Sequence, residues 1–174
     1  MRTRTPNRKG DDIIDENNKN DVVAILPHYD EEGKNCSKII FKDGKTLIRK
    51  TSVKATTNKF LSLYGLELNT LRRHYGRFFD TIHIPVPVKS NKVLVPLRFR
   101  SPIGKHDGAI GCLDYSSITG LKYKDIEEEG KVLYIGIKTG DKELELRVYQ
   151  KYKSTSKRLN QARLVLKLFN NEMW

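Results

Sequence analysis

Two alternating apolar runs near the C-terminal end of the chain constrain its fold more than any other feature. The runs 131–137 and 144–149 both place leucine, isoleucine or valine at every second position. Side chains at every second position of a strand share one face of a sheet. The tripeptide 139–141, Thr-Gly-Asp, suits a turn between the runs. The two runs therefore predict an antiparallel hairpin with one apolar face.

Two further β-branched runs lie near the N-terminal end. The first covers 22–26 and is ended by a proline, and the second covers 36–41, so both predict strands. Asp43 and Gly44 follow the second run, and this dipeptide favours a two-residue hairpin turn in which both residues take positive φ. We therefore expect residues 47–48 to return antiparallel to the second strand.

The period changes in the segment 57–75, where apolar residues recur every three or four positions and predict a helix. Thr57 can cap its start, Gly76 suits the position after its end, and Gly65 is the position at which it could break. The following segment, 78–99, is again rich in β-branched residues, but three prolines interrupt it. Because proline cannot donate to a sheet ladder, we expect short edge or bulged strands there.

A second helix is predicted at the C-terminal end. Ser154 or Ser156 could cap its start, and its apolar stripe consists of Leu159, Ala162, Leu166 and Phe169. The order of elements predicts an α+β fold: a mainly antiparallel β-sheet with one central helix and a C-terminal helix. Residues 1–20 are largely polar and predict a disordered N-terminal tail, which leaves 21–174 as a single domain.

The formal net charge of +12 on 174 residues limits the class of partner. Such a surface attracts polyanions, which are nucleic acid, anionic membranes or acidic proteins. No apolar run approaches the ~20 residues that span a bilayer, and no apolar signal-peptide core follows Arg2 and Arg4. We therefore expect a cytoplasmic protein that does not act at a membrane.

No set of residues in the sequence predicts catalysis, a metal site or a cofactor. Cys36 and Cys112 lie far apart, at no zinc-ligand spacing, and are expected to be reduced and buried. The four histidines are scattered and show no helical metal-ligand spacing. Nucleophile–base pairs and glycine-rich phosphate loops are absent from the sequence, and the acidic run 125–129 is expected to be a solvated loop. We therefore do not expect an enzyme.

The basic residues are concentrated in two stretches. The stretch 72–105 has eight basic residues and one acid, and the stretch 147–167 has seven basic residues and no acid. The first set is Arg72, Arg73, Arg77, Lys89, Lys92, Arg98, Arg100 and Lys105, and the second is Arg147, Lys151, Lys153, Lys157, Arg158, Arg163 and Lys167.

Several interpretations of the two stretches stay open. Each side chain taken alone could simply be solvated, but both stretches together favour DNA, with lysine on phosphates and arginine on base edges or in a narrow minor groove. The alternatives are a single-strand binder that stacks bases on Phe78, Phe79, Tyr123 or Tyr152, and a basic module that binds an acidic protein. The candidate DNA-binding residues are Arg72, Arg73, Arg77, Arg98, Arg100, Lys105, Lys151, Lys153, Lys157 and Arg158.

Several motifs resemble the ComK family of competence transcription factors. The sequences Val-Ala-Ile-Leu-Pro at 23–27 and Gly-Lys-Asn-Cys-Ser-Lys-Ile-Ile at 33–40 resemble the opening of that family, and the second motif is quite specific. Looser similarity continues through Lys59, Phe60 and Tyr64 and through 83–88, 91–96 and 144–169, so the resemblance covers nearly the whole chain after the tail.

The resemblance implies a transcription activator that binds AT-rich promoter boxes in double-stranded DNA, chiefly through the minor groove. It further implies a homodimer that pairs into a tetramer on two boxes, indirect recruitment of RNA polymerase, and control of DNA-uptake genes. Independently of the resemblance, the minor groove of DNA is about 6 Å wide and becomes narrower in A-tracts. The more negative potential of the narrowed groove favours an inserted arginine side chain. The expected readers, placed by charge, are Arg72, Arg73, Arg77, Arg98 and Arg100.

The chain departs from the family pattern in three places. It shows no counterpart of the C-terminal segment that links the best-studied member to adaptor-directed proteolysis, so we do not expect that control here. The regions 72–73 and 101–115 also diverge, which leaves the promoter sequence and the regulated process open.

Overall fold

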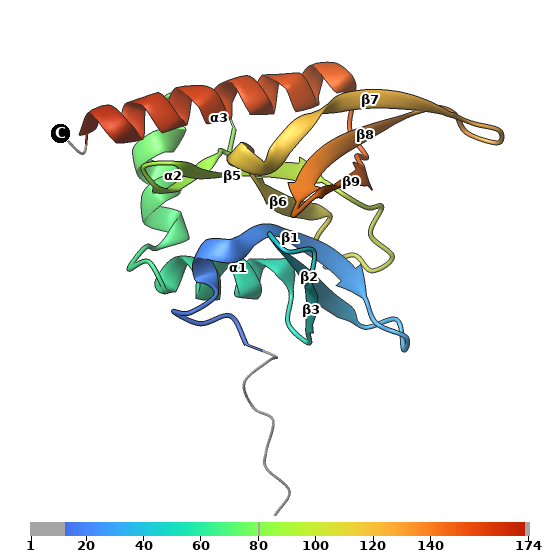
Figure 1. Ribbon diagram of the computed structural model, residues 1–174, viewed down its shortest axis with the longest axis horizontal. Coiled ribbons are helices and arrows are strands. Elements are labelled where there is room, and N and C mark those ends of the chain that lie inside the picture. The colour runs from blue at the N-terminus through green and yellow to red at the C-terminus, as the bar shows by residue number, and fades with distance from the viewer. Residues whose placement is uncertain (1–12, 80, 173–174) are drawn as a thin grey trace, which may run out of the picture.

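The computed structural model describes residues 13–79 and 81–172 and has the predicted α+β fold (Figure 1). Six strands form one antiparallel sheet in the order β3-β2-β1-β6-β5-β4, and three form a second in the order β7-β8-β9. The strands are β1 (Val22–Tyr29), β2 (Asn35–Phe41), β3 (Thr46–Arg49), β4 (Val86–Lys89), β5 (Lys92–Arg98), β6 (Ile110–Asp114), β7 (Ile118–Ile126), β8 (Gly130–Thr139) and β9 (Lys142–Arg147).

Helices cover the six-stranded sheet from both sides (Figure 1). The helices are α1 (Val53–Ser62), α2 (Leu68–Gly76) and α3 (Tyr152–Glu172), with short 3-10 turns η1 (Lys19–Asp21) and η2 (Tyr115–Ser117). Helix α3 packs on β5 and β4, and α1 packs on β1 and β2. Side chains alternate between the two faces of β5: Val93, Val95 and Leu97 are buried on one face, and the buried Leu94 and the half-buried Pro96 line a cavity between the sheet, α1 and α2 on the other.

The β8–β9 hairpin confirms the prediction made from the alternating runs. Ile135 lies opposite Leu146, and the last paired residues before the turn are Thr139 and Lys142. Gly140 takes a φ of +60° in the turn between them, a conformation that favours glycine.

The β2–β3 turn was predicted with the wrong geometry. The Gly44 N–H donates to the Phe41 carbonyl at 2.9 Å, and the Phe41 N–H donates to the Lys45 carbonyl at 2.9 Å. Gly44 takes a φ of +87°, but Asp43 does not take positive φ. The turn therefore has a three-residue loop with glycine in the left-handed position, and not a two-residue loop with both residues there.

The predicted central helix is in fact two helices, and the first begins earlier than expected. Helix α1 starts at Val53 because the Ser52 side chain accepts a hydrogen bond from the Ala55 N–H at 3.2 Å. Thr57, the predicted cap, lies inside the helix. Ser52, five residues before Thr57, was the better capping residue, and the apolar period alone did not reveal it.

Gly65 separates α1 from α2. It takes a φ of +67°, its N–H donates to the Ser62 carbonyl, and the Leu66 N–H donates to the Leu61 carbonyl, each at 3.0 Å. These two bonds are the Schellman ending of a helix, in which a left-handed residue satisfies the last carbonyls. The break that the sequence allowed at Gly65 is therefore the actual boundary.

Helix α3 begins at Tyr152, before both serines proposed as caps. Ala162 in its predicted apolar stripe is fully buried, and Leu159, Leu166 and Phe169 pack against the core from partly buried positions. The stripe is therefore core packing, as the sequence indicated.

The prolines of the segment 78–99 are not confined to an edge strand. β4 is the edge of the six-stranded sheet, but β5, which carries Pro96, pairs with both β4 and β6. Pro96 lies beyond Leu94, the last β5 residue in register with a β4 residue, and it pairs only with Cys112 of β6. A strand between two others can thus hold a proline where one neighbour has already ended.

Part of the predicted N-terminal tail belongs to the folded domain. Ile14 is buried in the core, and the Asn18 side chain accepts from the Asp15 N–H at 2.9 Å and donates to the Ile13 carbonyl at 2.8 Å. Residues 13–20 are therefore ordered because one isoleucine enters the core and a local turn satisfies the backbone. Residues 1–12, the rest of the predicted tail, lie outside the described residues.

A buried ion pair joins β5 to the end of β6. The Lys92 ammonium donates to Asp114 Oδ2 at 3.1 Å and to the Val22 carbonyl at 2.6 Å. Lys92 belongs to the first basic stretch of the sequence, but it is 2% exposed and cannot contact a partner. Burial lowers its pKa, and Asp114 opposes that shift.

Candidate nucleic-acid interface

Four exposed basic side chains gather where β5 meets the start of α3, and we call this set the basic ridge. The Tyr149 N–H donates to the Arg98 carbonyl at 2.8 Å, and the Arg98 N–H donates to Gln150 Oε1 at 3.0 Å. These bonds bring β5 against the segment that enters α3, although the two are far apart in sequence. The ridge consists of Arg98, Lys151, Lys153 and Lys157.

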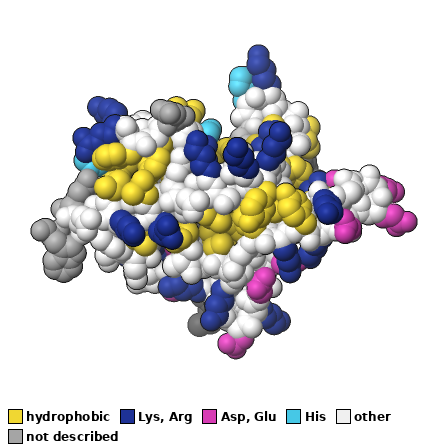
Figure 2. All heavy atoms as spheres, turned by 90° about the horizontal axis from the view of Figure 1, so that it is seen from above, with side chains coloured by type: hydrophobic (Ala, Val, Ile, Leu, Met, Phe, Trp, Pro, Cys, Tyr) yellow, Lys and Arg dark blue, Asp and Glu magenta, His cyan; other side chains and the backbone are white. Residues whose placement is uncertain are grey.

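The basic ridge carries unneutralised positive charge. None of its four side chains forms an ion pair with another described residue. Lys153 and Lys157 stand one helical turn apart, and the first turn of α3 contains no acidic residue that would offset the positive end of the helix dipole. Figure 2, viewed from the side of α3, shows basic side chains bordering a band of hydrophobic side chains, with acidic side chains toward the edges.

Three exposed tyrosines adjoin the ridge, and we call them the tyrosine cluster: Tyr123, Tyr149 and Tyr152. The rings of Tyr123 and Tyr152 stack with centroids 6.0 Å apart and planes at 26°, and they are 53% and 46% exposed. The Arg147 guanidinium lies 4.6 Å from the centre of the Tyr149 ring. Lys151 and Lys153 line the same open depression as these rings, so aromatic faces and positive charge meet on one surface.

Neighbouring acids neutralise other basic residues but not the ridge. Glu129 forms a two-pronged contact with Arg147, which lowers the pKa of its carboxyl. Glu145 on β9 pairs with both Lys122 and Lys124 on β7. Three basic residues of the three-stranded sheet thus have acidic partners, whereas the ridge residues have none among the described residues.

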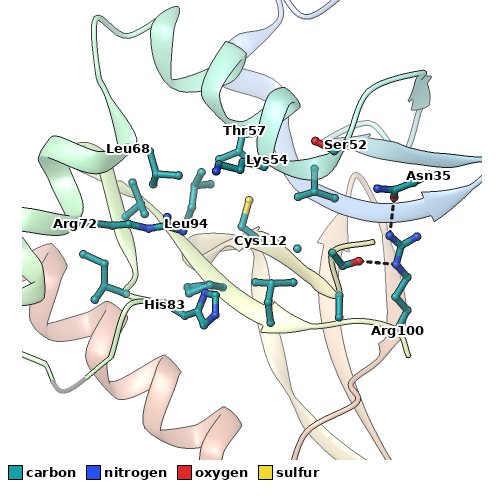
Figure 3. Close-up of a pocket in the computed structure, with 18 of the residues that line it drawn as sticks. Asn35, Ser52, Lys54, Thr57, Leu68, Arg72, His83, Leu94, Arg100 and Cys112 are labelled. Atoms are coloured by element: carbon teal, nitrogen blue, oxygen red, sulfur yellow. Dashed lines mark hydrogen bonds between the residues drawn. The ribbon is translucent and has the colours of Figure 1, made fainter. Parts of the chain in front are cut away.

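Two predicted DNA-reading arginines point inward. Arg72 and Arg100 both line the cavity between α1, α2 and the six-stranded sheet (Figure 3). Arg100 donates to the Gly108 carbonyl at 2.7 Å and to Asn35 Oδ1 at 2.6 Å, and its guanidinium lies 4.0 Å from the centre of the Tyr29 ring. These contacts hold Arg100 in place, and Arg72 is half-buried and lines the cavity, so the geometry does not support these two assignments.

The remaining predicted residues lie in three other environments. Arg73 and Arg77 are exposed on α2 and at its end, and Arg77 lies over the ring of Phe78 at 4.9 Å. Lys105 is exposed in the loop before β6. Arg158 is partly buried and donates to Thr81 Oγ1 at 3.1 Å and to Gln161 Oε1 at 3.2 Å, so it is a structural residue of α3.

Sequence reasoning missed Tyr149 and the contact between β5 and residues 149–150. Tyr149 alternates with apolar positions of the hairpin and looked like an ordinary strand residue. The contact joins Arg98 to residues 51 and 52 positions later, and no local pattern signals a pairing of that length. Tyr123 and Tyr152 were identified as exposed aromatics, but their mutual stacking was not.

The residues that the structure describes contain no paired cysteines, no grouped metal ligands and no membrane-spanning helix. Cys36 and Cys112 are free and buried, as predicted. Within residues 13–79 and 81–172 no three His, Cys, Asp or Glu side chains are grouped so that they could hold a metal ion. No helix in the same ranges has the length and apolar character needed to cross a membrane.

No protein-family model matches the sequence, and searches of curated proteins and of solved structures also find no match.

Proposed function

We propose that the protein binds double-stranded DNA through the basic ridge and acts as a ComK-like transcription activator with a preference for AT-rich promoters. The observation that carries the proposal is the ridge itself: exposed cations from β5 and α3, without ion-pair partners among the described residues, beside three exposed tyrosines. Lys153 and Lys157, one helical turn apart, are suited to contact neighbouring phosphates. Contact with phosphates supplies most of the non-specific affinity of a protein for DNA.

Arg98 is the proposed base reader. It is exposed on the ridge, and arginine is the side chain favoured in the narrow, negative minor groove of A-tracts. Arg73 and Arg77 are secondary candidates on α2, whereas Arg72 and Arg100 are withdrawn from the set because they line the cavity. The resemblance to the ComK family supports the same groove and the same base preference.

The first experiment measures the salt dependence of duplex binding by fluorescence anisotropy. The logarithm of the affinity should fall with the logarithm of the salt concentration, with a slope of about −0.9 for each phosphate contacted. Replacing the ridge lysines by glutamine, as Lys151→Gln, Lys153→Gln and Lys157→Gln together, should make the slope shallower by about 2.7 if each lysine contacts one phosphate.

A matched control removes three lysines from the opposite side of the molecule. The β2–β3 hairpin lies far below α3 in Figure 1. The hairpin and the residue that follows β3 carry three exposed lysines, so a triple glutamine variant of them has the same net charge as the ridge variant. The control variant should keep the slope of the unaltered protein, and an equal loss in both variants would mean that only net charge matters. The control substitutions are Lys42→Gln, Lys45→Gln and Lys50→Gln.

Base selectivity tests the second half of the proposal. An AT-rich duplex should bind more tightly than a GC-rich duplex of equal length, and Arg98→Ala should reduce AT-rich binding by about 1–3 kcal/mol. Arg98→Lys keeps the charge but loses the planar fork, so it should lower selectivity more than affinity. Equal affinities of the unaltered protein for the two duplexes would contradict sequence-selective binding.

The tyrosine cluster favours a second candidate, the binding of single-stranded nucleic acid. Exposed aromatic rings beside lysines are the means by which such proteins stack bases and hold the backbone. In that case a single strand should displace the duplex, and Tyr152→Leu should weaken binding of the single strand while leaving duplex binding unchanged. Displacement by an acidic protein alone would instead indicate the third alternative, a basic interaction module.

The cellular setting follows from the resemblance and is part of the proposal. We propose a cytoplasmic protein that binds its promoters as a homodimer or as two dimers and acts on RNA polymerase indirectly. Light scattering of the protein with a duplex containing one or two AT-rich boxes tests this, and a one-to-one complex on both duplexes would contradict it.

A further inference from the structure

A cavity of about 410 Å³ lies between α1, α2 and strands β4–β6 (Figure 3). Its walls are mainly apolar and include Leu68, Ile84, Val86 and Leu94. Cys112 also lines it, and burial raises the pKa of the thiol to about 12, so the sulfur is uncharged. The volume lies within the ~300–1,000 Å³ range of small-molecule sites.

Five basic side chains line the cavity, beside the neutral polar side chains of Asn35, Ser52 and Thr57. Lys54 of α1, Arg72 of α2, His83 before β4, and Arg100 and His106 of the loop before β6 line it. None of the described lining residues is acidic. In Figure 3 Arg72 and Arg100 stand at opposite ends, with Cys112 between them.

Both arginines have hydrogen-bonding capacity left over at this cavity. Arg72 Nε and Arg100 Nη1 are buried and have no hydrogen-bond partner among the described residues. A buried donor without an acceptor costs about 1–3 kcal/mol, and native structures usually satisfy such groups with protein, water or ligand. An acceptor that enters the cavity could satisfy either group after a small rotation of the guanidinium.

His83 adds a neutral polar group between the cavity and α3. Burial lowers the pKa of its imidazole, with further contributions from Arg158 and Arg72. A neutral imidazole can donate to or accept from a ligand, but it adds no charge to the cavity at neutral pH. The positive potential therefore comes from Arg72, Arg100 and Lys54.

We propose that this cavity is a binding site for a small organic acid, with the carboxylate or phosphate at an arginine and an apolar body along β4 and β5. An isolated inorganic anion would leave the apolar walls uncovered, and a neutral apolar molecule would leave the arginine donors unsatisfied. A DNA phosphate cannot occupy the site, because the unpaired arginine donors are buried. The cavity and the basic ridge share no residue, so this proposal does not depend on DNA binding.

The first test compares matched probes on the unaltered protein by calorimetry. Phenylacetate and phenyl phosphate carry an acid on an aromatic body, phenylacetamide is the neutral counterpart, and inorganic phosphate is the anion alone. At least one of the two acids should bind saturably, and phenylacetamide and inorganic phosphate should both bind at least about tenfold more weakly. The acid that binds distinguishes a carboxylate from a phosphate site, and absence of saturable binding by both acids would overturn the proposal.

The second test uses adjacent arginines of one helix. Arg72→Met removes one of the two cavity arginines and should weaken binding of the better acid by at least about tenfold, whereas Arg73→Met, on the exposed side of α2, should leave it unchanged. Amide resonances of Cys112 and Gly108 should shift on binding, and those of β9 should not. Equal affinities of both variants would overturn the assignment, and the probe comparison decides the matter even if Arg72→Met does not fold.

Discussion

Replacement of Lys92 by methionine tests what holds the two sheets in place. The Lys92 ammonium reaches Asp114 Oδ2, the Val22 carbonyl and, at 3.4 Å, the Asn20 carbonyl, and thereby joins β5, β6, β1 and the segment before β1. Asp114 also accepts from the Ser116 N–H at 3.2 Å, at the 3-10 turn that leads into the second sheet. One ammonium group therefore connects four segments at the junction of the sheets.

The expected loss follows from what Lys92→Met leaves behind. The side chains of Lys92 and Asp114 are 2% and 3% exposed, so the substitution leaves a buried carboxylate without its counter-ion. Removing one partner of a buried pair costs about 3–5 kcal/mol. Because whole domains are stable by only about 5–15 kcal/mol, the variant should be close to unfolding at higher temperature.

The measurement is urea-induced unfolding followed by circular dichroism. Adding Asp114→Asn to Lys92→Met replaces the stranded charge with an amide, so the double variant should be more stable than the single one by about 1–3 kcal/mol. Lys89→Met is the matched control, since Lys89 pairs with Lys92 in the sheet register but holds only an exposed contact to Asn20. A loss in Lys92→Met below about 1 kcal/mol, or no recovery in the double variant, would refute the electrostatic reasoning.

Three further substitutions test local features. Gly65→Ala should cost about 1–2 kcal/mol in urea unfolding because φ is +67°, whereas Gly76→Ala, a helical glycine with free space around it, should be neutral or stabilising. The buried Ser37 hydroxyl lies 2.6 Å from Thr56 Oγ1, so Thr56→Val should leave it without this hydrogen-bond partner and lower the free energy of unfolding by about 1–3 kcal/mol. A smaller loss in the double variant Ser37→Ala/Thr56→Val would confirm the pair. Because the pKa of His83 is lowered in the folded protein, the unfolded chain binds a proton at this histidine more readily. The melting temperature should therefore fall as the pH drops below 6.5, and His83→Gln should make that fall smaller.

The sequence predicted those parts of the fold in which local pattern and environment agree. The β8–β9 hairpin has apolar alternation and a glycine at the turn, so period and turn chemistry point to the same register. The helical break at Gly65 was visible as a glycine in a helical pattern, but its Schellman bonds depend on the residues around it. The early start of α1 was missed because the apolar spacing begins only at Phe60, about two turns after the capping Ser52.

The candidate site was predicted less well because the sequence does not show toward which side of the fold a charged side chain points. Arg72 and Arg73 are neighbours with the same chemistry, yet only Arg72 lines the cavity, since successive helical residues point about 100° apart. Arg98 and Arg100 also differ, because Arg100 is fixed by Asn35 and Tyr29 from another part of the sheet. Tertiary contacts of this kind decide which cations are exposed, and residue counts cannot reveal them.

The separation of inward from outward cations also makes the two proposals independently testable. Lys151, Lys153 and Lys157 lie on the basic ridge, whereas Arg72 and Arg100 line the cavity, and no residue belongs to both sets. If one diffuse positive field attracted every anion, Arg72→Met and the triple glutamine variant would weaken duplex and organic-acid binding together, in proportion to the charge removed. If geometry decides, the ridge variant should lose only the salt-dependent binding of duplex, and Arg72→Met only the binding of the acid. An arginine that lines a cavity and a solvated lysine present their charge to different ligands.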